Sequence, residues 1–258
     1  MVKLLTLLNC YSYPVLIWLT LSSVLEYFYL LLRSFKIKNL NILYENENFI
    51  IFNKPNGFLT HPAKHTNENT LRDELIKLHP SITEWGVPYR EGIVHRLDKV
   101  TSGLILCALN ELTFKVLSDK FKKRTIKKTY ISIIEGKTNT ESGIIDLPLK
   151  RSIENRNKRT VAKNGRESIT EFNTILKTSN YSQISINLIT GRNHQIRAHM
   201  EYLKTPVVND TLYGANRLNF LQPYEICLHS SALEFSIFNE DYNFKVDPPL
   251  FFNRVLEV

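Results

Sequence analysis

Two stretches of alternating apolar and polar residues constrain the fold of this chain more than any other feature. They are TYISIIEG at residues 129–136 and YSQISINLIT at residues 181–190. An apolar residue at every second position turns one face of an extended strand toward a core and the other toward water. We therefore expect both stretches to be half-buried strands, and such one-sided strands are typical of antiparallel sheets.

Segments with helical spacing lie between and after these strands. Asn110 is expected to open a helix with one apolar face, and a second helix is expected at residues 69–78, capped by Asn69 or Thr70. In residues 194–203 the apolar residues recur three and four positions apart and should face the core. The polar residues left together on another side of that helix are His194, Arg197 and Glu201.

The first 36 residues are set apart from the rest by their composition. Residues 4–25 carry no charge and are about as long as a membrane-spanning helix, which is roughly 20 residues. Pro14 and several hydroxyl residues argue against a span, whereas Lys3 supplies the short positive start of a leader peptide. Membrane anchor, leader and non-functional extension stay open as alternatives. We predict one catalytic domain at residues 37–258.

Charge and composition narrow the class of protein. Hydrophobic residues make up 43% of the chain, which is enough for a sizeable core and excludes global disorder. The chain carries 33 Lys and Arg against 25 Asp and Glu, a formal charge of +8. Such an excess suits a polyanion such as nucleic acid, or an anionic membrane surface, although many proteins are mildly basic without either partner.

Much of the positive charge is concentrated in two clusters. In KFKKRTIKK, residues 120–128, six of nine positions are Lys or Arg. Cations near a helix C-terminus are favourable in any protein, which explains part of this cluster. The second cluster lies on a predicted loop, where arginine density favours contacts with phosphate over a merely solvated surface. Its members are Lys150, Arg151, Arg156, Lys158, Arg159, Lys163 and Arg166.

Several kinds of chemistry lack their usual signatures. The three cysteines are roughly a hundred residues apart, which is neither a disulfide framework nor a zinc spacing, so we expect a reducing compartment. The chain has no glycine-rich dinucleotide or P-loop motif and no H-E-x-x-H. His61 and His65 stand four apart, but Pro62 between them disfavours a helical metal pair. We predict no metal and no cofactor.

Three residues are candidates for chemistry on position alone. Asp98 lies in HRLDK between two cations and just before a turn, so it is either a turn aspartate or a nucleophile or base in a cationic cleft. Tyr130 follows the first basic cluster, where a ring can stack on an RNA base for roughly 1–3 kcal/mol or can be an ordinary strand residue. Arg197 has a plain alternative as a surface partner of Glu201.

Taken together, five segments resemble the RluA-type family of RNA pseudouridine synthases. The segments are NKPNGFLTHP, GIVHRLDKVTSGLILCALN, KKTYISIIEG, ITGRNHQIRAHM and NDTLYG, and the likeness covers residues 40 to about 245. The resemblance implies an α+β fold, a largely antiparallel mixed sheet with flanking helices, that works without cofactor or metal. Thr211 stands where relatives often have proline, and Val100 where an acidic residue is common.

The resemblance implies an isomerase that detaches uracil from ribose, turns it and rejoins it through carbon 5. It implies that Asp98 is the catalytic residue, that Tyr130 packs against the base and assists proton removal, and that Arg197 pairs with the aspartate. Elementary chemistry agrees with these roles. A fixed carboxylate can attack an electron-poor sugar or remove a ribose proton, and a nearby cation keeps that carboxylate ionised.

The target uridine must leave its helix or loop, at a cost of a few kcal/mol. Arg96 is a candidate to fill the vacated stack or grip a phosphate, and Arg192 and His194 to line the entrance. His61 and His95 are expected to be structural. The remaining predicted RNA-binding residues belong to the two basic clusters: Lys122, Lys123, Arg124, Arg156, Lys158 and Arg159.

The expected RNA is ribosomal, with transfer RNA as the second choice. Many relatives carry an S4 RNA-binding module, but residues 1–39 are too few and too apolar to form one. We expect a cytoplasmic monomer, with an organellar or membrane-tethered protein as the alternative. The rival function is an RNA-binding or ribosome-assembly protein that keeps the fold and has lost catalysis.

Overall fold

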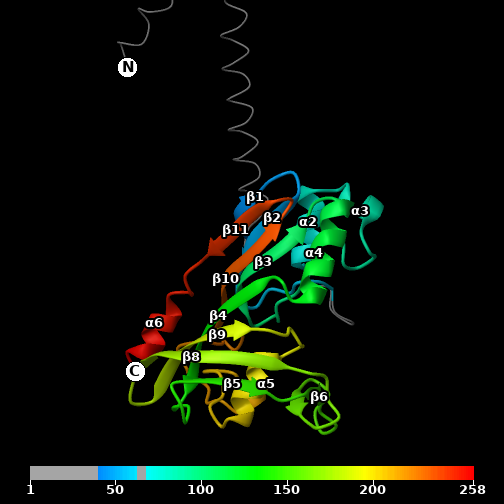
Figure 1. Cartoon of the computed structure of the whole chain (residues 1–258). Coiled ribbons are helices and arrows are strands. Elements are labelled where there is room, and N and C mark those ends of the chain that lie inside the picture. Colours follow the sequence, from blue (N-terminus) through cyan, green and yellow to red (C-terminus); the bar gives the residue numbers. More distant parts are fainter. Residues whose placement is uncertain (1–39, 63–67) are drawn as a thin grey trace, which may run out of the picture. The chain divides into compact units, whose positions relative to one another are not determined.

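The two alternating stretches are neighbours in one large sheet. The computed structural model describes residues 40–62 and 68–258, and in it the stretches form β4 (Lys127–Glu135) and β9 (Tyr181–Leu188), paired antiparallel (Figure 1). Buried and half-buried residues alternate along the whole of β9. The prediction of half-buried antiparallel strands is confirmed.

Nine of the described strands form this sheet, in the order β1-β2-β3-β10-β4-β9-β8-β5, with β11 paired to β10. Only β3 and β10 run parallel among these pairs, so the predicted largely antiparallel mixed sheet is confirmed. The bounds of the other strands are β1 Asn41–Glu45, β2 Phe49–Lys54, β3 Ser102–Ala108, β5 Ser142–Asp146, β8 Ile169–Lys177, β10 Leu228–Ile237 and β11 Glu240–Lys245.

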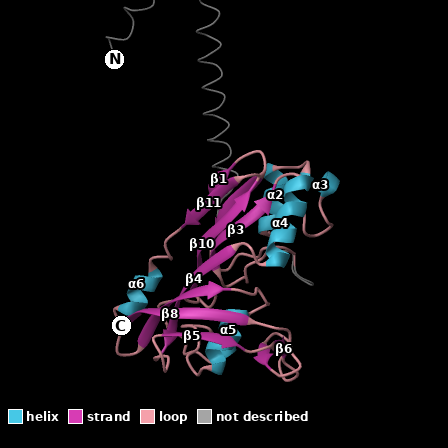
Figure 2. Ribbon diagram, viewed as in Figure 1, coloured by secondary structure: helices cyan, strands magenta, loops and turns pink. Residues whose placement is uncertain are grey.

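Two helices begin at caps that the sequence predicts. In α4 (Glu111–Lys123), the Asn110 side chain accepts the Thr113 amide at 2.9 Å. In α2 (Leu71–Leu78), Thr70 and the third helical residue cap each other reciprocally. Figure 2 shows α2 and α4 beside the strands β1 to β3, and α5 beside β8 and β5. The other helices are α3 Ile82–Trp85, α5 Gln195–Tyr202, η1 Thr211–Tyr213 and α6 Phe251–Leu256.

One core cluster of the described residues lies between α4 and the strands around β3. Leu117 of α4 belongs to this cluster together with Leu104 and Leu106 of β3, and all three side chains are fully buried. Burial of such side chains stabilises a fold by about 1.5–3 kcal/mol each. The loop at residues 95–101 leads directly into β3 and is therefore anchored to this core.

One local prediction is wrong. The second basic cluster is not an open loop. It is largely a hairpin of β6 (Leu149–Arg151) and β7 (Arg159–Val161), which packs beside α5 because Leu149 is buried there.

The N-terminal predictions lie outside the described residues. They concern the hydrophobic segment at residues 1–36 and membrane contact through residues 4–25. Among the helices within residues 40–62 and 68–258, none is long and apolar enough to cross a membrane.

Candidate active site

The loop that carries Asp98 is held in place by hydrogen bonds to its backbone. The Thr60 hydroxyl donates to the Leu97 carbonyl at 2.8 Å. The Lys99 carbonyl accepts the Gly57 amide at 2.8 Å and the Lys54 ammonium at 3.4 Å. Asp98 thus sits between two fixed residues, and its side chain is 15% exposed.

Arg197 of α5 contacts two carboxylates. Its Nε and Nη2 donate to the two oxygens of Asp210 at 2.6 and 2.8 Å, and its Nη1 donates to Asp98 Oδ2 at 3.3 Å. The guanidinium also lies over the Tyr213 ring, 4.9 Å from the ring centre. The alternative of a surface pair between Arg197 and Glu201 is wrong, because Arg197 is buried and Glu201 pairs with Lys158.

His194 stands at the N-terminus of α5 and reaches the same carboxylate. Its backbone is in the left-handed region (φ +56°), and its Nε2 is 3.8 Å from Asp98 Oδ2. Its Nδ1 is 3.0 Å from the Tyr213 hydroxyl oxygen. Arg197 and His194 therefore approach Asp98 from one helix end.

The neighbouring basic groups keep Asp98 ionised. Burial acts to raise the pKa of its carboxyl, but the neighbouring His194, Arg197 and Arg96 lower the pKa below the ordinary value for aspartate. Tyr130 of β4, in contrast to Asp98, keeps its proton. Burial raises the pKa of its phenol, and the negative charge of Asp98 acts in the same direction, so the hydroxyl stays protonated.

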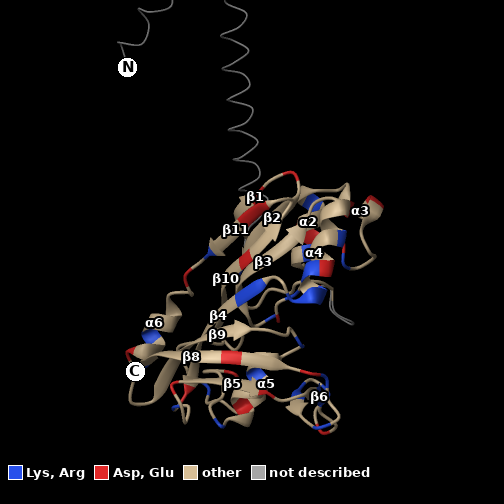
Figure 3. Ribbon diagram, in the orientation of Figure 1, with Lys and Arg blue, Asp and Glu red and all other residues tan. Residues whose placement is uncertain are grey.

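Asp98 and Tyr130 line one cavity of about 560 Å³. Asp98 is the single carboxylate among the described residues of its wall. Figure 3 shows basic residues gathered where α4 ends and β4 begins, next to this region. The seven Lys and Arg residues of the wall are Arg90, Arg96, Lys122, Arg124, Lys128, Arg192 and Arg197. A cavity with one carboxylate among many cations suits a ligand that carries several phosphate groups. The reactive centre of such a ligand could lie close to Asp98.

Residues 48–202 match the RNA pseudouridylate synthase family. The chain belongs to this family. It is 38% identical to "Ribosomal large subunit pseudouridine synthase D" of Borreliella burgdorferi, over 76% of this chain and 61% of the relative. It is 32% identical to the "Uncharacterized RNA pseudouridine synthase YlyB" of Bacillus subtilis, over 69% of this chain and 59% of the relative. The chain thus spans about three fifths of the length of these relatives.

Solved structures of the pseudouridylate synthase family share the fold. The human protein "RNA Pseudouridylate Synthase Domain Containing 1" is 25% identical, with a TM-score of 0.66 over 83% of this chain and 85% of that one. The human "RNA Pseudouridylate Synthase Domain Containing 4" aligns with a TM-score of 0.67 at 23% identity, over 84% of this chain and 92% of that one. The α+β fold is therefore that of the pseudouridylate synthases.

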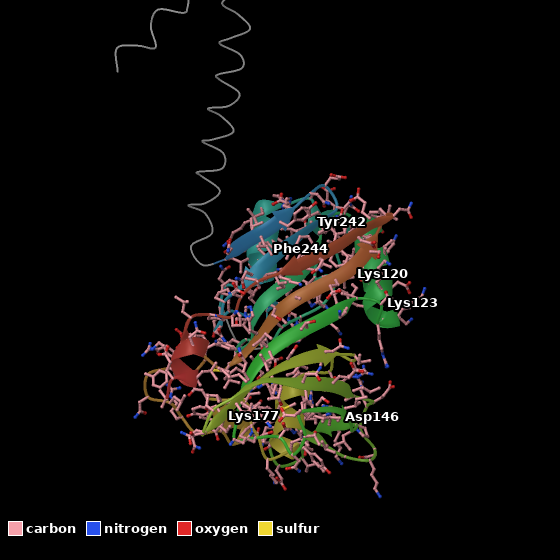
Figure 4. The ribbon with its side chains drawn as sticks, turned by 60° about the vertical axis from the view of Figure 1, so that its left-hand side comes forward. Lys120, Lys123, Asp146, Lys177, Tyr242 and Phe244 are labelled. Carbon is pink, nitrogen blue, oxygen red and sulfur yellow. The ribbon has the colours of Figure 1, made fainter. Side chains whose placement is uncertain are left out.

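The wall of the cavity includes five of the nine predicted RNA-binding residues: Arg96, Lys122, Arg124, Arg192 and His194. Arg96 also contacts a ring nitrogen of His61 at 2.9 Å, and Arg192 donates to the Glu167 carbonyl at 2.9 Å. Lys123 is outside the wall. It pairs with Asp119 at 2.8 Å and lies on the outer side of α4, near Lys120 (Figure 4).

The other three predicted RNA-binding residues are in or next to the β6–β7 hairpin. Arg156 is exposed in the turn of the hairpin. Lys158 pairs with Glu201 at 2.5 Å, and the Arg159 amide donates to the Tyr213 hydroxyl at 2.8 Å. The hairpin is thereby attached to α5 and η1, beside the cavity but outside its wall.

Sequence reasoning missed several residues of this site. Lys128 lies two positions before Tyr130 on β4, and this period-two spacing was a signal that both line the cavity. Lys54 is fully buried, and burial lowers its pKa to about 7, against the effect of Asp98. Asp210 and Tyr213 come from the NDTLYG segment, whose side chains gave no local signal of contact with Arg197.

The two histidines expected to be structural are close to the cavity. His95 stacks on Phe121 with ring centres 4.5 Å apart, and its Nε2 accepts the Leu106 amide at 2.8 Å. His65, considered with His61 as a metal pair, lies outside the described residues. Within residues 40–62 and 68–258, no three His, Cys, Asp or Glu side chains are grouped to hold a metal ion.

Proposed function

We propose that the protein is an RNA pseudouridine synthase in which Asp98 is the catalytic residue. One observation carries the proposal. A single ionised carboxylate, in hydrogen-bond contact with a buried arginine, stands in a cationic cavity that also holds a protonated tyrosine. This arrangement supplies one group to react at the sugar and several to hold phosphates.

The reaction exchanges one bond to uracil for another. The bond between ribose C1′ and uracil N1 breaks, and its electron pair leaves with the base. Asp98 either attacks C1′ or removes a ribose proton. The base turns, a bond forms between C1′ and C5, the C5 proton leaves and N1 gains a proton. Arg197 holds Asp98 anionic and aimed, since a cation nearby favours the charged form.

Tyr130 holds the detached base and takes part in the proton transfers. Its ring can stack on uracil, which keeps the base in the cavity while it turns. Because its phenol is protonated, Tyr130 acts as a hydrogen-bond donor or as one step of a proton relay rather than as a preformed phenolate.

The basic residues supply the grip on RNA. Arg96 fills the gap left by the extruded uridine or holds a flanking phosphate, and the remaining cations of the cavity wall contact neighbouring phosphates. The exposed Arg156 and the rest of the hairpin extend this surface along the RNA. Arg192 lines the entrance and contacts RNA there, whereas His194 lies beside it and faces Asp98.

The proposed substrate is large-subunit ribosomal RNA, because the Borreliella burgdorferi relative bears that name. Transfer RNA is the second candidate. The proposed division of the chain is a hydrophobic segment at residues 1–36 and a catalytic domain at residues 37–258. We further propose that the enzyme acts as a monomer in the cytoplasm, where its free cysteines Cys107 and Cys227 stay reduced.

The test compares wild type, Asp98→Asn and Asp119→Asn on a large-subunit ribosomal RNA transcript labelled with tritium at uracil C5. Tritium release and pseudouridine content are measured under single-turnover conditions. Asp119 is a matched control because it is exposed on α4 and outside the cavity wall. We expect release with wild type and Asp119→Asn and none with Asp98→Asn.

Equal release by Asp98→Asn and wild type would refute the role of Asp98. Tight binding of the RNA by wild type without any pseudouridine, on both ribosomal and transfer RNA, would instead favour the RNA-binding or ribosome-assembly protein without catalysis.

A further inference from the structure

The Tyr213 hydroxyl lies between the Arg159 amide and the His194 ring. Its oxygen accepts the amide N–H of Arg159 at 2.8 Å and lies 3.0 Å from His194 Nδ1. The Tyr213 side chain is 1% exposed, so water has little access to it. A phenol that accepts one hydrogen bond has its own proton left to donate, and His194 Nδ1 is the nitrogen in reach.

A neutral imidazole carries one proton. When Nδ1 accepts the bond from Tyr213, the proton is on Nε2. Nε2 is the ring nitrogen close to the carboxylate, 3.8 Å from Asp98 Oδ2.

The surroundings keep His194 neutral. Burial lowers the pKa of its imidazole most, and Arg197 and Arg159 act in the same direction, against the carboxylates Asp98 and Asp210. His194 is thus a donor to Asp98 that does not compete with the carboxylate for a proton.

Both donors approach the same oxygen of Asp98. Arg197 Nη1 is 3.3 Å and His194 Nε2 is 3.8 Å from Oδ2. No described side chain donates a hydrogen bond to Oδ1. Oδ1 is therefore the oxygen left to face the ribose.

We propose that His194 is a positioning residue that donates Nε2–H to Asp98 Oδ2, held in that tautomer by Tyr213, so that Oδ1 points at the sugar. The proposal rests on the proposed function of Asp98. The 3.8 Å separation shortens to a hydrogen bond when uridine fills the cavity, since such contacts tighten in the substrate complex. Its role differs from RNA binding, which would require contact with the nucleic acid itself.

Two substitutions at His194 separate these roles. His194→Asn keeps a polar atom near the Nδ1 position and tolerates the left-handed backbone, but has nothing at Nε2. His194→Gln places an amide N–H at about the reach of Nε2. We expect His194→Asn to lower the single-turnover rate about 10- to 100-fold with unchanged RNA affinity, because it removes a hydrogen bond to a charged group. His194→Gln restores most of the rate.

The pH profile gives a readout that a purely structural role would not change. The groups facing Asp98 are Arg96 of its own loop, Arg197 and His194 of α5, Lys54 of β2, Tyr130 of β4 and Tyr213 of η1. Burial raises the pKa of Asp98 and the neighbouring groups lower it. When the His194 donor is lost, the effect of burial is less well balanced and the pKa of Asp98 rises. The acid limb of the rate moves to higher pH in His194→Asn and stays near its wild-type position in His194→Gln.

A spectroscopic measurement tests the tautomer without RNA. The full-length protein is labelled with ¹⁵N-histidine, and the His194 signals are assigned by their loss in His194→Gln. Long-range ¹H–¹⁵N correlations distinguish the two neutral tautomers. We expect Nε2–H in wild type and a mixture of tautomers in Tyr213→Phe, which lacks the hydroxyl but keeps the ring.

The proposal is overturned by an Nδ1–H tautomer in wild type. It is also overturned by a wild-type rate and pH limb in folded His194→Asn, or by a loss of RNA affinity that accounts for the whole defect. If wild type makes no pseudouridine, the proposed function fails, whereas the tautomer measurement stands by itself.

Discussion

Arg197 is bound more firmly to Asp210 than to Asp98. It makes two hydrogen bonds to Asp210, at 2.6 and 2.8 Å, and one to Asp98, at 3.3 Å. The Asp210 side chain is 2% exposed and that of Asp98 is 15% exposed. Asp210 therefore fixes the guanidinium, which presents an N–H of Nη1 to the proposed catalytic carboxylate.

Asp210→Asn and Asp98→Asn should have different effects on stability. Asp210→Asn leaves a buried arginine without its main partner, so we expect the free energy of unfolding to fall by about 3 kcal/mol. Asp98→Asn removes a weaker and more accessible contact and should cost about 1 kcal/mol or less. Urea denaturation of both variants measures the difference. An equal loss would show that Asp98 and Asp210 hold Arg197 alike.

Acid should destabilise the fold through its buried histidines. Burial lowers the pKa of His95 to about 3, with Lys128 acting in the same direction, whereas an unfolded histidine titrates near the usual value of about 6.5. Between these values the unfolded chain binds more protons than the folded one. Each such histidine therefore contributes stability that is present above pH 6.5 and is lost as the pH falls, by about 1.4 kcal/mol per pH unit.

His95→Gln tests this explanation. A glutamine oxygen can take the place of Nε2 and accept the Leu106 amide, but it does not titrate in this range. We expect the slope of unfolding free energy between pH 6 and pH 4 to decrease by about 1.4 kcal/mol per pH unit. Part of the slope remains, because burial also lowers the pKa of His229 to about 4. An unchanged slope would assign the acid sensitivity to other groups.

The features predicted correctly from sequence depend on short stretches of chain. Thr70 and Asn110 cap their helices through residues three positions away, and β9 shows its alternation within eight residues. The pairing of Arg197 depends on the path of the chain between α5 and η1. The local candidate was Glu201, four positions on, but Lys158 of the hairpin pairs with it instead.

Part of the cavity wall was predictable because its residues are close together in the sequence. Tyr130 and the basic cluster before it are close in sequence, so their proximity could be inferred. Arg90 comes from a turn before β3, and nothing in its neighbourhood shows that it shares a wall with Lys128 and Arg192. Such groupings arise from the order of strands in the sheet, which residue patterns do not determine.

Tyr130→Phe should separate base stacking from proton transfer. The variant keeps the ring, which is 6% exposed, and removes only the hydroxyl. We expect the single-turnover rate to fall about 100-fold or more if the hydroxyl assists proton transfer, with little change in RNA affinity. Rapid-quench measurement of tritium release, together with filter binding, provides both quantities. An unchanged rate would leave stacking as the only role of Tyr130.

The β6–β7 hairpin should contribute to the salt dependence of RNA binding. Arg156 is exposed in its turn, whereas Lys158 is engaged by Glu201 and lies 5.0 Å over the centre of the Tyr213 ring. We expect Arg156→Gln to weaken binding and to reduce the slope of log affinity against log salt by about 0.7–0.9, as for one lost phosphate contact. Substitution of Arg156, Lys158 and Arg159 together should reduce the slope further.

Lys177→Gln is the matched control, because Lys177 is exposed, pairs with Glu141 and is outside the cavity wall (Figure 4). Equal slopes for Arg156→Gln, Lys177→Gln and wild type would show that the turn of the hairpin does not contact RNA.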